Sequence, residues 1–147
     1  MNNCKIRGFW HVVLTGPDGA VKQSIGGENV ITTVGKQYLA SFLNSAATAA
    51  TTFTARYIAI GTNSTAEAAA DTQLGTEVAR HTGSVSASGA IYTIVATFPA
   101  GTGTGAIVEY GLLNSNTAGT LFSRDTEAVI NKGAGDTLTV THNVTFS

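Results

Sequence analysis

Alternation of apolar and polar side chains is the feature that most constrains the fold of this chain, and it is clearest over residues 137–146. There, every second residue is apolar or aromatic, and the residues between them are Thr or Asn. A period of two places the two sets on opposite faces of a β-strand, with one face buried. The buried set is Leu138, Val140, His142, Val144 and Phe146.

Further segments of this kind predict an antiparallel β fold. Residues 4–14 alternate, and the Pro, Asp and Gly of residues 15–20 predict a hairpin turn. The returning strand is expected over Val21–Ile25, ending at Gly26 and Gly27. Other strands are predicted at residues 57–60, 76–81, 90–98, 107–113, 121–124 and 137–146. Roughly eight or nine short strands favour an all-β fold, an antiparallel β-sandwich of jelly-roll-like form.

One segment departs from the β pattern. Apolar residues recur with helical spacing over about ten residues, which predicts one short helix near residues 33–43. Thr32 or Thr33 can cap its start through a side-chain oxygen. Gly35 weakens this helix by about 1 kcal/mol relative to Ala, so the helix should depend on packing against a sheet. Residues 44–54, mostly Ala, Thr and Ser, predict a loop.

Length and charge narrow the class of protein. The chain has 147 residues, which predicts a single domain spanning 1–147. Charged residues make up 12% and the net charge is −1, so nucleic acid is not an expected partner. Neither an apolar run of membrane-spanning length nor the apolar stretch of a signal peptide is found, so we expect a soluble protein with no membrane partner. A weakly charged surface is poorly protected against association and favours an assembly component.

Motifs for catalysis, metals and cofactors are not found. Residues 101–106 match G-x-G-x-x-A, but strand-like residues follow them where a dinucleotide site needs a helix. The three histidines stand apart from other ligands, and the single Cys4 allows neither an internal disulfide nor a cysteine-based metal site. There is no G-x-S-x-G motif, and the few carboxylates show no paired arrangement. We therefore predict no catalytic residue, no cofactor and no metal.

Charged residues inside otherwise apolar strands indicate where the chain forms ion pairs. Glu109 interrupts an apolar run, where an unpaired charge is costly, and Arg80 and Arg124 also lie in predicted strands. We predict a partly buried ion pair that fixes strand register or an intersubunit contact; the alternative is that each charge reaches solvent at a strand edge. The two candidate pairs are Glu109–Arg124 and Glu77–Arg80. His81 is expected in a polar cluster at a strand end or in a titrating interface contact.

Residues 1–14 are a candidate docking strand or arm. Phe9 and Trp10 lie beside Lys5 and Arg7, and Trp and Arg are typical anchors of protein contacts. The alternative is an ordinary first strand with Trp10 in the core. The predicted interface candidates are Arg7, Phe9, Trp10, Arg80, His81, Glu109 and Arg124.

Several motifs follow one another in a recognisable order. A strand with the sequence YIAIGTN leads into D-T-x-L-x-x-E-x-x-R, which ends at Arg80, and then come VEYGLLN, GTLFSRD and KGAGDTLTVTHNVTF. With these motifs, the chain resembles small structural proteins of tailed bacteriophage virions over about residues 29–146. The resemblance implies a protein that binds other virion proteins and is not an enzyme.

Among virion roles, we favour a capsid cement or decoration protein that binds across capsid subunits and stabilises the phage head. This function implies two partners, the major capsid protein and the chain itself, as homodimer or homotrimer. It places the protein on the capsid exterior after synthesis in the host cytoplasm. A fibre subunit would normally carry coiled coil or collagen-like repeats. The alternatives are a tail, collar or fibre-associated structural protein or adhesin, and a small hydrolase.

Overall fold

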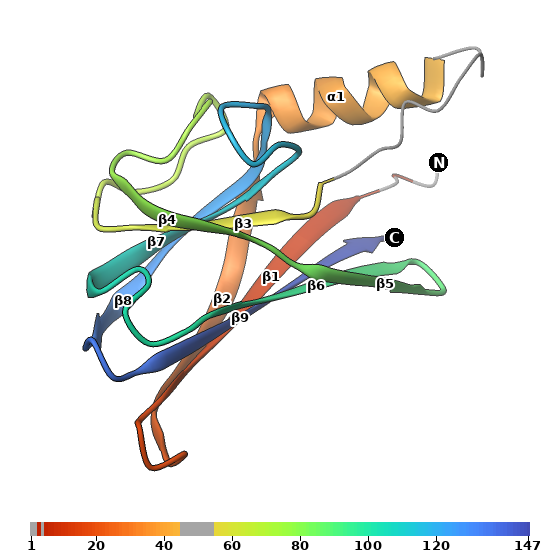
Figure 1. The fold of residues 1–147 in the computed structure, drawn as a ribbon. Helices are drawn as coiled ribbons and strands as arrows, with labels where there is room; N and C mark the ends of the chain where they lie inside the picture. Colours follow the sequence, from red (N-terminus) through yellow and green to blue (C-terminus); the bar gives the residue numbers. More distant parts are fainter. Residues whose placement is uncertain (1–2, 4, 45–54) are drawn as a thin grey trace.

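Nine antiparallel strands and one helix form the fold in the computed structural model, which describes residues 3, 5–44 and 55–147 (Figure 1). The strands are β1 (Ile6–Thr15), β2 (Val21–Ile31), β3 (Tyr57–Gly61), β4 (Glu77–Thr82), β5 (Ser84–Ser88), β6 (Ile91–Phe98), β7 (Gly105–Leu113), β8 (Leu121–Lys132) and β9 (Thr137–Phe146), and the helix is α1 (Thr33–Asn44). The prediction of an all-β antiparallel fold with one short helix is confirmed.

The nine strands form one sheet in the order β4-β3-β7-β8-β2-β1-β9-β6-β5. Its two outer strands, β4 and β5, follow one another in the chain with only Gly83 between them, so the sheet curves round and nearly closes (Figure 1). We call β2, β1, β9, β6 and β5 wall A, and β8, β7, β3 and β4 wall B. The finer expectation of a jelly-roll sandwich stays a prediction.

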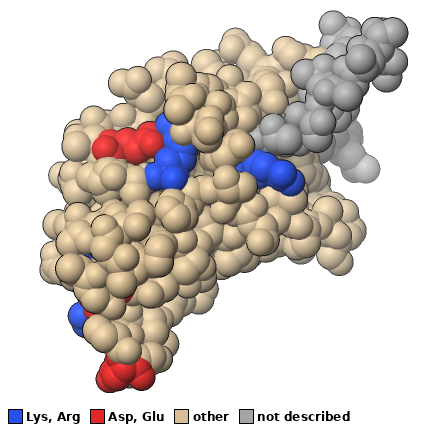
Figure 2. All heavy atoms as spheres, in the orientation of Figure 1, with Lys and Arg blue, Asp and Glu red and all other residues tan. Residues whose placement is uncertain are grey.

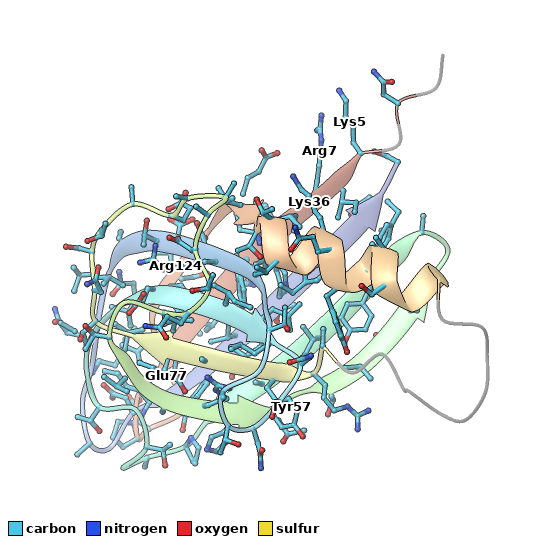
Figure 3. All side chains as sticks on the ribbon, turned by 90° about the horizontal axis from the view of Figure 1, so that it is seen from above. Lys5, Arg7, Lys36, Tyr57, Glu77 and Arg124 are labelled. Carbon is cyan, nitrogen blue, oxygen red and sulfur yellow. The ribbon has the colours of Figure 1, made fainter. Side chains whose placement is uncertain are left out.

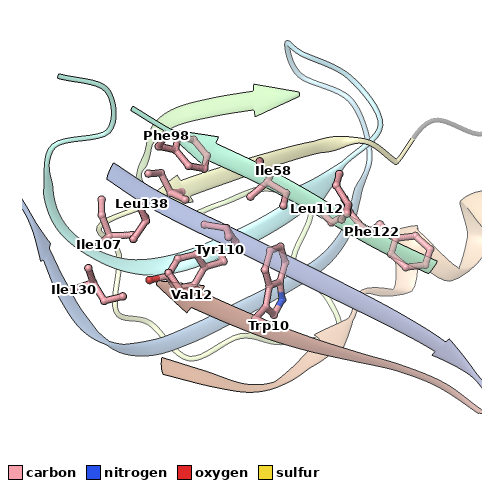
Figure 4. Close-up of a cluster of buried hydrophobic side chains, with 14 of the residues drawn as sticks. Trp10, Val12, Ile58, Phe98, Ile107, Tyr110, Leu112, Phe122, Ile130 and Leu138 are labelled. Atoms are coloured by element: carbon pink, nitrogen blue, oxygen red, sulfur yellow. The ribbon is translucent and has the colours of Figure 1, made fainter. Parts of the chain in front are cut away.

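Apolar side chains from both walls fill the space between them (Figure 4). Trp10 of β1 stacks on His142 of β9, with 4.0 Å between the ring centroids, and lies 6.0 Å from Tyr110 of β7. Strand β1 is paired with β2 on one side and with β9 on the other. Residues 6–14 are therefore an ordinary strand of wall A.

This arrangement corrects two predictions at the N-terminus. Trp10 has an exposed fraction of 0%, so it cannot anchor a partner as an interface residue. A docking arm that included residues 6–14 would have to break the hydrogen-bonded ladders on both sides of β1, so the docking role does not fit this part of the segment. Cys4 lies outside the described residues.

Three strand boundaries differ from the predictions because pairing overrides local signals. β2 continues through Gly26 and Gly27, since both residues pair with β1, opposite His11 and Trp10. β8 runs past the predicted end at residue 124, since its second half pairs with the first half of β7. β5 was not predicted, because its side chains are small and all of them are exposed; pairing with β6 makes it a strand.

Helix α1 depends on packing, as predicted. The Thr32 hydroxyl accepts a hydrogen bond from the Gly35 N–H at 3.0 Å and caps the first turn. Gly35 lies so close to β8 that a Cβ there would be 2.4 Å from the carbonyl oxygen of Phe122. The glycine that weakens the helix therefore permits its contact with the sheet. Of the predicted loop 44–54, Asn44 belongs to α1, and residues 45–54 lie outside the described part.

Candidate functional site

Both predicted ion pairs are formed, and the first is deeply buried. Arg124 donates from Nε and Nη2 to Oε2 of Glu109, at 3.1 and 2.9 Å. The exposed fractions of the two side chains are 3% for Arg124 and 0% for Glu109. The pair joins β7 to β8 on the outer side of wall B, since Gly111 and Arg124 are partners in that ladder.

The same two side chains hold the long segment between β3 and β4, residues 62–76. Glu109 accepts hydrogen bonds from the backbone N–H groups of Gly75 and Thr76, at 2.9 and 2.7 Å. Arg124 donates to the Asp71 carboxylate at 3.0 Å and to the Thr65 carbonyl at 2.9 Å. These four groups of residues 62–76, together with the Arg124–Glu109 pair, leave neither charge unpaired, so the cluster fastens residues 62–76 over wall B.

The second pair fastens another loop to the same wall. Arg80 contacts both carboxylate oxygens of Glu77, the shorter distance being 2.7 Å. Its Nη1 also donates to the carbonyl oxygens of Ser115 and Ala118, each at 2.8 Å. Residues 114–120 are thereby tied to β4. His81 takes no part in this polar cluster, because its ring lies against Phe98, with 5.0 Å between centroids.

Loops therefore cover part of the outer side of wall B, while Val78 of β4 and Val129 of β8 stay exposed, at 40% and 47%. A small apolar cluster lies beneath the loops, where Leu74 packs with residues of β3, β7 and β8. Leu74 reaches the strand at Gly111, where a Cβ would lie 2.3 Å from its Cδ1 atom. Three predicted interface candidates, Arg80, Glu109 and Arg124, make these contacts within the chain.

Two further ionisable groups lie between the walls, and the sequence did not single out the first. Asp125 has an exposed fraction of 1%, and burial, reinforced by the carboxylate of Glu127, raises its pKa to about 8. Burial lowers the pKa of His142 to about 3, so its imidazole is neutral at pH 7. Both side chains are buried between the walls and pack within the chain.

Within residues 3, 5–44 and 55–147, no group of three or more His, Cys, Asp or Glu side chains could hold a metal ion. No helix among these residues is long and apolar enough to cross a membrane.

The outer face of wall A differs from that of wall B because it carries no charged side chain over most of its area. Antiparallel pairing aligns its outward side chains in rows from β1 across β9 and β6 to β5. The rows are Phe9–Asn143–Thr93–Ser86, His11–Thr141–Val95–Ser84, Val13–Thr139–Thr97 and Thr15–Thr137. We call these residues the threonine face. Phe9 is its most exposed large apolar side chain, at 45%.

Charged side chains flank the threonine face at its two ends, with Arg7 on β1 and Glu28 on β2 at one end and the Lys22–Asp136 pair beside Thr15 and Thr137 at the other. The helix contacts β8 of wall B, and no described element packs over the rows. Figure 2 shows how sparse the charged side chains are on the side of the molecule that it presents. Arg7 and Phe9 remain the two predicted interface candidates that are exposed on this wall.

Comparison with known proteins identifies no relative: no protein-family model, no curated protein and no solved structure matches the chain. The resemblance to phage structural proteins therefore stays a prediction that rests on the sequence motifs.

Proposed function

We propose that this chain is a non-enzymatic structural protein of a tailed bacteriophage virion, and specifically a capsid cement or decoration protein. It binds other virion proteins through the threonine face and opposes the separation of capsid subunits. The motifs that resemble phage structural proteins support the virion location. The contrast between the two walls supports binding as the activity.

The observation that carries this proposal is the asymmetry of the two outer faces. Wall B is partly covered by loops that Arg124, Glu109 and Arg80 hold in place, whereas the threonine face is left uncovered by described elements. A face of hydroxyl, amide and methyl groups loses little when water leaves it, because no ion has to be desolvated. Such a face is suited to a partner surface that is also uncharged.

The size of the threonine face suits a partner that is present in many symmetry-related copies. Four strands about 4.8 Å apart, five to ten residues long, span roughly 15 Å by 27 Å, on the order of 400 Å². A stable interface of standard size buries about 800 Å² on each partner. One copy therefore makes a modest contact, and many copies on a symmetric shell multiply its effect. The major capsid protein is the partner that offers such repetition.

The test is co-sedimentation of the purified chain with intact capsids and, separately, with isolated tails of the phage that encodes it. Saturable binding to capsids, together with greater resistance of the loaded capsids to heat, is the expected result. The saturating ratio would give the copy number. Binding to tails alone would instead assign the chain to the tail, collar or fibre class, and absence of binding to both would exclude a virion role.

A further inference from the structure

A concavity lined by positive charge lies beside the threonine face. Lys5, Ile6, Arg7 and Lys36 line an open pocket of about 480 Å³. Figure 3 shows the side chains of Lys5, just before β1, of Arg7 on β1 and of Lys36 on α1 near one another. All three cationic side chains are exposed. We call them the basic pocket.

The fold holds these three residues in place. Lys5 and Arg7 are two positions apart and so point to the same side of the strand. Lys5 extends the ladder of β1 with β9, because Ser147 donates from its backbone N–H to the Lys5 carbonyl at 2.9 Å. Lys36 lies in the first turn of α1, which the contact of Gly35 with Phe122 seats on β8.

The cations of the basic pocket are unpaired among the described residues, whereas other cations of the chain are paired. Lys22 binds Asp136 at 2.9 Å, and Arg80 and Arg124 bind the carboxylates described above. No such ion pair involves Lys5, Arg7 or Lys36 in the part of the chain that the structure describes. Glu28 is the acidic residue of the adjoining strand, and it faces Phe9.

Three like charges around one concavity repel each other, and an anion shared between them removes the repulsion. This local excess occurs in a chain whose net charge is −1, so it is a property of the pocket and not of the whole surface. Three cations around a compact pocket can pair with two or three carboxylates, and Ile6 adds apolar contact for the stems of acidic side chains. A nucleic acid would instead use an extended track of cations, which this chain lacks.

We propose that the basic pocket binds an acidic segment of a partner protein, next to the contact made by the threonine face. This inference rests on the proposed function and deepens it by giving the chemistry of a second contact with the partner. The uncharged face supplies area, and the pocket fixes orientation and speeds association, which is the usual contribution of complementary charges.

The test uses a fluorescent peptide of alternating Glu and Gly residues as the probe, with a Gln–Gly peptide of the same length as its control. Binding is measured by fluorescence anisotropy at low salt for the full chain and for the variants Arg7→Glu and Lys36→Glu. The matched control is Arg56→Glu, which makes the same charge change at an exposed cation outside the pocket. Circular dichroism of each variant verifies the fold.

The expected result is binding of the Glu–Gly peptide that weakens as salt is raised. R7E and K36E should each reduce the affinity about tenfold, while R56E should leave it within about twofold. Equal losses in all three variants, or no binding of the Glu–Gly peptide by the wild type, would overturn the proposal. Tighter binding of duplex DNA or of anionic lipid vesicles than of the peptide would overturn the partner class.

Failure of this inference can be separated from failure of the proposed function. If K36E loses the peptide but binds capsids with unchanged affinity and rate, the basic pocket is not a contact to the capsid, and the cement function survives. If the wild type binds the peptide but neither capsids nor tails, the pocket survives and the virion role fails.

Discussion

At the scale of single residues, the most telling side chain is Glu109, whose charge is buried in the centre of a strand. A buried carboxylate is tolerated only when its charge is paired and its oxygen atoms are hydrogen-bonded. Glu109 meets both conditions through Arg124 and the backbone N–H groups of Gly75 and Thr76. Since these donors come from two separate segments, the residue acts as a fastening point for residues 62–76.

Replacing Glu109 by Gln tests this role. The substitution removes the buried negative charge and leaves Arg124 with only the partly exposed Asp71 as its counter-ion. We expect E109Q to lower the free energy of unfolding by about 3–5 kcal/mol. The measurement is urea denaturation followed by circular dichroism. Glu77→Gln, at the more exposed pair with Arg80, is the control and should cost less than about 1 kcal/mol. Equal effects of the two substitutions would contradict the account.

Asp125 makes a second prediction at this scale, on the dependence of stability on pH. Burial raises its pKa in the folded state to about 8 from 3.8, so between these values the folded chain holds a proton that the unfolded chain releases. The contribution of Asp125 to the free energy of unfolding is fully present below about pH 4. It is lost as the pH rises towards 8, by at most about 1.4 kcal/mol per pH unit.

Asp125→Asn retains the shape of the neutral carboxyl group and removes its titration. The free energy of unfolding of D125N, relative to the wild type, should therefore increase steadily from pH 5 to pH 8. Thermal unfolding at a series of pH values measures this difference. The control is Ser86→Ala, at an exposed position of β5 that carries no ionisable group, and its difference from the wild type should not vary with pH. A flat difference for D125N as well would rule out a buried, protonated Asp125.

At the scale of elements, α1 shows that a residue with poor helix propensity can be required by tertiary contact. In an exposed helix interior, replacing Gly by Ala stabilises by about 1 kcal/mol. At Gly35 the added methyl group would meet backbone atoms of Phe122, which cannot move aside as a side chain can.

We therefore expect Gly35→Ala to destabilise the chain by about 1–3 kcal/mol, the usual effect of overpacking. Chemical denaturation measures this change, and Ser41→Ala, at an exposed position of the same helix, serves as the control and should be nearly neutral or slightly stabilising. If G35A proved more stable than the wild type, α1 could not be packed on β8 as closely as described.

The elements also show what the sequence could and could not predict. Strands with alternating side chains, such as β9, and the capped helix α1 were predicted because their signals are local. The continuation of β2 through Gly26 and Gly27, and the whole of β5, depend on pairing with the neighbouring strands β1 and β6, which glycines and small exposed side chains do not signal.

The same division holds for the candidate sites. The pairs at Glu109 and Arg80 were predictable, because a charge within an apolar run requires a partner. The basic pocket was not, since Lys36 is brought to Lys5 and Arg7 only by the fold. Asp125 was missed because the predicted strand ended one residue before it.

At the scale of the whole molecule, the two walls divide the tasks. The charged side chains of wall B are used to hold its own loops, and the threonine face of wall A carries uncharged groups over an area that suits a modest, repeated contact. The outer side of wall B is therefore partly covered by the chain's own loops, and the threonine face is available to a partner. In the proposed function, that partner is the capsid.

The most direct test of this account places a charge in the centre of the threonine face. Thr141 lies in the middle row, between His11 and Val95, so Thr141→Arg would force an ion into the contact. The control is Ser64→Arg, on the loop that covers wall B. Co-sedimentation with intact capsids should show that T141R reduces binding at least about tenfold, while S64R binds as the wild type does. Equal binding of T141R and the wild type, with both variants folded, would contradict the claim that the threonine face is the binding surface.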